Sequence, residues 1–173
     1  MGQEKAYSYS LFKQLKDETH NSVSKLPTSN FIGAELRYHF DTNSKVALVG
    51  GKYSSLSKQE EVPLSGFNSI IELGENELSS KLLYKDAQWK ERNWQELSWY
   101  IQYVHELKEK NYLIARIRER KHFDSWQRDE VLLGYNYKLK PTLSLKSEVR
   151  QIKQTGVNSF KSNELFLSLS VLF

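Results

Sequence analysis

Three arginines recur at every second position near the middle of the chain. The stretch R-I-R-E-R holds Arg116, Arg118 and Arg120, and residues two apart on an extended strand point to the same face. Guanidinium groups bind phosphate and carboxylate groups well, because each presents a planar fork of donors. In a narrow lumen, such a row would guide anions such as phosphates, uronates or lipid A groups.

Other charged residues fall on the same kind of face in neighbouring segments. They are Lys138, Lys146, Arg150, Glu96 and Glu148. Because both signs are present, a second interpretation stays open. The arginines could pair with Glu96, Glu148 or Glu130 and fill the lumen, since the interior of a small barrel is just wide enough for its own side chains.

The segments that carry these residues alternate between apolar and polar positions, which is typical of β-strands. In 31–40, for example, Ile32, Ala34, Leu36 and Phe40 share one face. Segment 94–121 also fits a helical stripe, but its β-branched and aromatic residues favour strand. We therefore expect ten strands, at 6–15, 31–40, 45–56, 67–73, 78–85, 94–107, 112–122, 130–139, 143–153 and 163–173.

The connections between these segments are predicted to alternate in length. Short turns are expected near residues 42, 75, 109 and 141, and longer loops at 18–30, 57–66, 86–93, 123–129 and 154–162. Short connections on one side and long ones on the other are typical of outer-membrane barrels. The predicted fold is all-β, an antiparallel transmembrane β-barrel of ten strands, with eight or twelve as the alternatives.

The amino-acid composition further limits the class of protein. The chain has 173 residues with 25 Lys plus Arg, 21 Asp plus Glu and no cysteine. Disulfides and thiolate chemistry are excluded, and a charge excess shared along the chain does not indicate nucleic acid. No apolar run is long enough for a transmembrane helix, and the opening M-G-Q-E-K lacks the apolar core of a signal peptide. We expect a single barrel domain over 1–173, either whole or as the barrel module of a longer chain.

The final segment reads N-E-L-F-L-S-L-S-V-L-F. It resembles the C-terminal strand of Gram-negative outer-membrane β-barrel proteins, in which a last Phe follows apolar residues at every second position. Phe173, Val171, Leu169 and Leu167 match that pattern. The resemblance implies that the strand is read by the barrel assembly machinery, and that the protein lies in the bacterial outer membrane among lipid and lipopolysaccharide.

Two histidine motifs could serve a hydrolase at the barrel rim. His122 and Asp124 resemble the His and Asp of omptin-type outer-membrane proteases, although the chain is much shorter. His20-x-Ser22 has the spacing seen in lipid A deacylases, but it lies in an expected loop. The histidines show no metal-ligand spacing, and no cofactor is indicated.

The predicted function is non-enzymatic. We expect a membrane anchor or a small channel for anionic solutes such as acidic saccharides, with an export or uptake complex as a further partner. Two alternatives remain open: an outer-membrane hydrolase with a rim active site, and a soluble lipocalin-like barrel that binds a small ligand.

Overall fold

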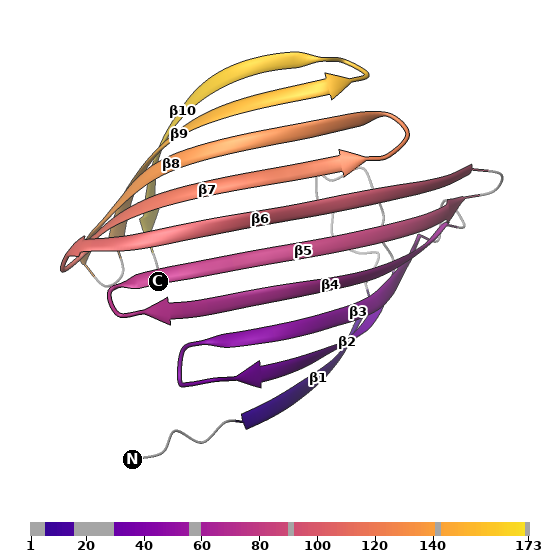
Figure 1. The fold of residues 1–173 in the computed structure, drawn as a ribbon, viewed down its shortest axis with the longest axis horizontal. Helices are drawn as coiled ribbons and strands as arrows, with labels where there is room; N and C mark the ends of the chain where they lie inside the picture. The colour runs from indigo at the N-terminus through magenta and orange to yellow at the C-terminus, as the bar shows by residue number, and fades with distance from the viewer. Residues whose placement is uncertain (1–5, 16–29, 56–59, 90–91, 141–142, 172–173) are drawn as a thin grey trace.

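The computed structural model describes residues 6–15, 30–55, 60–89, 92–140 and 143–171. These residues form one antiparallel sheet in which the ten strands follow one another in chain order (Figure 1). The strands are β1 (Ala6–Leu15), β2 (Asn30–His39), β3 (Lys45–Ser55), β4 (Glu60–Leu73), β5 (Asn76–Trp89), β6 (Arg92–Lys108), β7 (Asn111–His122), β8 (Trp126–Lys140), β9 (Leu143–Gly156) and β10 (Phe160–Val171). The predictions of an all-β antiparallel fold and of ten strands are confirmed.

The strands are long. β6 has 17 residues, which at about 3.3 Å per residue extends roughly 56 Å. A strand that crosses a bilayer at a tilt needs only about 9–11 residues, so all ten are long enough. The segment that also fitted a helical stripe forms β6 and β7, as its β-branched and aromatic content favoured.

Four of the five predicted long loops are largely strand. Residues 60–66 belong to β4, 86–89 to β5 and 126–129 to β8, and the β9–β10 turn is confined to residues 157–159. The predicted asymmetry of loop length is therefore wrong at these four connections. In these extensions the few apolar side chains, such as Val62 and Ala87, lie on the inner face rather than the outer one. The apolar outer stripe of the strand middles therefore does not continue through them, so hydropathy does not mark them as strand. The fifth loop, 18–30, lies almost wholly outside the described residues.

The two end strands are not joined. β1 pairs only with β2, and β10 only with β9; within the described residues, β1 and β10 share no contact. The sheet is strongly curled, and the left ends of β8 to β10 turn down behind the strands in front (Figure 1). Closure of the sheet through β10 and β1 thus stays a prediction.

The two faces of the curled sheet differ in exposure. The large buried apolar side chains Val62, Leu132 and Ile152 share one face, together with Ala47 and Ala87. We call this the inner face, because side chains crowd together on the concave side of a curved sheet. The other, outer face carries exposed apolar side chains, among them Leu36, Leu48, Ile101, Ile117, Leu133, Val149, Leu165 and Leu167.

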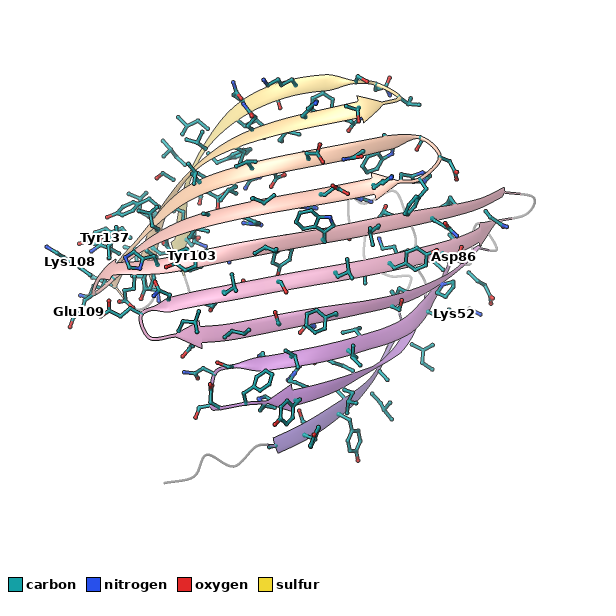
Figure 2. The ribbon with its side chains drawn as sticks, in the orientation of Figure 1. Lys52, Asp86, Tyr103, Lys108, Glu109 and Tyr137 are labelled. Carbon is teal, nitrogen blue, oxygen red and sulfur yellow. The ribbon has the colours of Figure 1, made fainter. Side chains whose placement is uncertain are left out.

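Aromatic side chains gather at one end of the outer face. They are Tyr7, Tyr38, Phe40, Tyr103, Tyr135 and Tyr137. Figure 2 shows Tyr103 and Tyr137 beside Lys108 at the end of the β6–β7 turn, whereas Lys52 lies at the opposite end of the sheet. The Tyr103 hydroxyl donates to Asn76 Oδ1 at 2.7 Å. Rings with an apolar body and a hydrogen-bonding tip are typical of a membrane interface.

Candidate anion-binding face

The arginine ladder lies on the inner face of β7. Arg116, Arg118 and Arg120 stand opposite Gln102, Tyr100 and Ser98 on β6, and opposite Leu132, Glu130 and Arg128 on β8. The alternation predicted from R-I-R-E-R is therefore present. Among the described residues, only Arg120 of the three forms an ion pair, and the Nε of Arg116 is buried without a hydrogen-bond partner.

Arg120 belongs to a compact ion cluster that we call the Glu96 cluster. The Glu96 side chain accepts hydrogen bonds from Lys85 Nζ at 3.0 Å and from Arg120 Nη2 at 2.7 Å. Glu96 is only 3 % exposed. Because Lys85, Glu96 and Arg120 come from β5, β6 and β7, the cluster links three consecutive strands through one shared carboxylate.

A second group of charges, which we call the Glu130 site, lies beside it. Arg118, Arg120, Arg128 and Glu130 line a depression of about 110 Å³. Glu130 is 6 % exposed, and no described residue forms a hydrogen bond or ion pair with it, although its charge acts through space on Arg150. Arg118 and Arg128 likewise form no ion pair within the described part of the chain.

The β7–β8 connection adds aromatic rings next to this site. The ring of His122 stacks between those of Trp94 and Trp126, with centroids 5.4 Å and 6.1 Å away. The guanidinium of Arg120 lies 5.3 Å from the Trp126 ring. These contacts hold Arg120 against the wall at the same time as Glu96 binds it.

The same contacts leave the predicted protease-like pair unassembled. His122 Nδ1 is 2.9 Å from Ser125 Oγ, and no hydrogen bond joins His122 to the exposed Asp124 in the described part of the chain. The second motif, His20-x-Ser22, lies outside the described residues. No group of His, Asp and Glu among the described residues could hold a metal ion.

The remaining predicted site residues lie farther along the inner face. Arg150 pairs with Glu148 on the same strand at 2.5 Å and lies over the Phe166 ring at 4.3 Å. Lys138 lies 4.5 Å from the Tyr112 ring. Lys146 stands opposite Asn136 on β8 and Ser168 on β10. The role of these residues toward anions remains a prediction.

Three of the four residues of the predicted assembly signal, Leu167, Leu169 and Val171, lie on β10. Leu167 and Leu169 on β10 are 72 % and 61 % exposed, on the outer face. The backbone of Val171 pairs with Leu143. Phe173 lies outside the described residues.

Two residues of these sites do not follow from the sequence predictions. They are Lys85, which binds Glu96, and Arg128, which lines the Glu130 site. Arg128 was assigned to the expected loop at 123–129, whereas it is in β8. Extending the period-two pattern backward from Leu132 through Glu130 to Arg128 would have found it. Lys85 was placed on the polar face, but its partner depends on strand register.

Comparisons with known proteins bear on the fold. No protein-family model matches the chain, and no curated protein matches its sequence. A solved structure is similar in shape: an anion-selective porin from Comamonas acidovorans, with a TM-score of 0.70 and 11 % sequence identity. The match covers 95 % of this chain and 54 % of the porin, so the chain spans about half of that protein's length. The chain therefore has a porin-like antiparallel fold.

No helix in the described part of the chain is long and apolar enough to cross a membrane.

Proposed function

We propose that the chain forms the wall of an outer-membrane β-barrel channel that favours anions, and that it is not an enzyme. The observation that carries the proposal is the inner face of β7 and β8. There, Arg116, Arg118 and Arg128 have no ion-pair partner within the described residues, so their charge is available to a solute. Guanidinium groups on a low-dielectric wall attract anions more strongly than they would in bulk water.

The outer face supports a lipid location. Its exposed large side chains are mostly apolar in the middle of the strands and aromatic at one end. A soluble lipocalin-like barrel would instead turn its charged face to water and its apolar face inward. The similarity in fold to an anion-selective porin agrees with this orientation.

A membrane location sets a requirement for the two edges of the sheet. Unpaired N–H and C=O groups are costly in hydrocarbon, so β1 and β10 must be paired in the bilayer, with each other or with other strands. We further infer that the barrel assembly machinery reads β10, and that lipid and lipopolysaccharide surround the outer face.

The hydrolase alternative has less support. His122 is stacked between two tryptophans and bonded to Ser125 rather than to an acid. A rim protease would need an aligned acid–base pair.

The proposal is tested by conductance across a planar bilayer. The full chain, folded in detergent, should insert and give steps whose reversal potential in a KCl gradient shows a preference for chloride. Replacing Arg116, Arg118 and Arg128 together by Gln should remove most of that preference without removing the conductance. A monodisperse protein that folds in plain buffer and gives no conductance would refute the membrane location and the channel together.

A further inference from the structure

We propose that the Glu130 site binds a carboxylate whose neighbouring carbons carry hydroxyl groups, such as a sugar acid. The inference deepens the proposed function, on which it rests, by assigning a solute class to one place on the wall. Three observations support it: the arrangement of the arginines, the state of Glu130 and the size of the depression.

The arginines of the site repel one another, and a bound anion would reduce this repulsion. Arg120 and Arg128 stand directly opposite each other on β7 and β8, and like charges in opposite positions destabilise a sheet. Glu96 compensates Arg120, but Arg128 has no ion pair within the described residues, and neither does Arg118 one register step away. A carboxylate in the depression would accept hydrogen bonds from these two free guanidiniums.

Glu130 requires a hydrogen-bond donor on the ligand, whereas the arginines require an acceptor. An ionised carboxylate can only accept hydrogen bonds, and the carboxylate of Glu130 is accessible from the depression that it lines. Glu130 is 6 % exposed and lines the depression, with no donor from a described residue. A ligand that satisfies Glu130 must therefore donate a hydrogen bond.

The donor that fits best is a hydroxyl group. A second carboxylate on the ligand would repel Glu130, whereas an ammonium group would be repelled by the three arginines around it. A hydroxyl is neutral and can donate to Glu130 while the ligand's carboxylate binds Arg118 and Arg128.

The size of the site limits what enters it. The site is a small depression of about 110 Å³. The depression therefore accommodates the acid end of a solute and the nearest hydroxyl-bearing carbons, while the rest of the molecule extends into the space along the inner face. Ile152 stands opposite Glu130 on β9 and is 1 % exposed, so the strand position next to Glu130 is apolar.

The test compares two six-carbon acids, D-gluconate and hexanoate, which differ in their hydroxyl groups. Binding to the full chain in detergent is followed by tryptophan fluorescence, since Trp126 contacts Arg120. We expect gluconate to bind about tenfold more tightly than hexanoate, as a hydrogen bond to a charged group would give. Equal affinities in the native protein would overturn the proposal.

Two variants test whether Glu130 and Arg128 cause the preference for gluconate over hexanoate. Glu130→Met keeps the side-chain length but removes the acceptor, so the gluconate preference should fall to about twofold or less, while hexanoate binds at least as well as before. Arg128→Met should weaken both acids. Lys81→Met, on the inner face of β5 but outside the depression, is the matched control and should leave the preference unchanged. Retention of the full preference in Glu130→Met would refute the role of Glu130.

Folding and channel activity are measured in the same preparations. If Glu130→Met does not show the heat-modifiable gel shift of the native protein, Glu130→Gln replaces it, and a smaller fall in preference is expected because the amide still accepts. Anion-selective conductance without a gluconate preference would refute this site but leave the channel. A gluconate preference without conductance would refute the channel but leave the site.

Discussion

The Glu96 cluster and the Glu130 site lie side by side on the same inner face, yet they satisfy their charges differently. In the first, one carboxylate is held by two cations from the strands on either side. In the second, one carboxylate lies among three arginines and forms no hydrogen bond with any described residue. The Glu96 cluster is internally compensated, whereas the Glu130 site has unpaired groups of both signs.

Charged residues on the inner face of the sheet therefore have two different roles. A closed network such as Lys85–Glu96–Arg120 contributes to stability, because removing Glu96 leaves Lys85 and Arg120 without the carboxylate that they share. An open group such as Arg118–Arg128–Glu130 is available to a solute. Charged residues on one face are not equivalent, even when they alternate in the same way along the sequence.

The largest expected effect concerns Ile152, the buried apolar residue that stands opposite Glu130 on β9. Ile152→Ala should lower the free energy of unfolding by about 2–4 kcal/mol, because the side chain is 1 % exposed and its loss leaves a cavity. Urea unfolding in lipid vesicles, followed by tryptophan fluorescence, measures it. Val157→Ala, at a side chain 60 % exposed in the β9–β10 turn, is the control and should cost less than about 0.5 kcal/mol. Equal costs would show that Ile152 is not packed.

The next prediction contrasts the two carboxylates directly. Glu96→Gln should cost about 1.5–3 kcal/mol, because it weakens two charge-assisted hydrogen bonds. Glu130→Gln should change stability by less than about 0.5 kcal/mol, since no protein partner is lost. The same urea titrations apply to both variants. If Glu130→Gln is as costly as Glu96→Gln, the distinction between a closed and an open group is wrong.

Arg120 and Arg128 stand opposite each other, but replacing them should have different effects on anion selectivity and on stability. Arg128→Gln should reduce the chloride preference of the conductance roughly twofold, because it removes a positive charge that faces the solute. It should not lower stability, because it relieves the repulsion from Arg120 on the opposite strand. Arg120→Gln should instead lower stability, since it removes a partner of Glu96. Reversal potentials and unfolding midpoints are compared for each variant. A stability loss confined to Arg128→Gln would reverse the two assignments.

The smallest effect is expected for an acid outside both groups. In the β2–β3 turn, the amides of Ser44 and Asn43 donate to Asp41 at 2.6 Å and 2.9 Å, and these bonds lower the pKa of Asp41 below its ordinary value of 3.8. The stability that its carboxylate contributes is therefore complete above that value and is lost as pH falls through the lowered pKa. Asp41→Ala should be slightly less stable than the native protein at about pH 7, and this difference should shrink at about pH 3. A difference that does not depend on pH would contradict the role of the carboxylate.

Much of the fold follows from local sequence. Side chains alternate across an extended backbone, so the alternation in 31–40 and 112–122 identified strands and assigned Arg116, Arg118 and Arg120 to one face. In 60–66 and 126–129 the outer-face positions are not apolar, so the alternation that marks the strand middles is weak there and predicts loop where the structure has strand.

The sequence by itself determined the ten strands, the apolar outer face and the charged inner face, because each depends on a period of two within one segment. Only the tertiary structure decided that Glu96 binds Lys85 and Arg120, while Glu130 and Arg128 face a depression without partners. The physical reason is register. Which side chains stand opposite each other depends on how neighbouring strands slide past one another, and a shift of one residue moves every side chain to the other face.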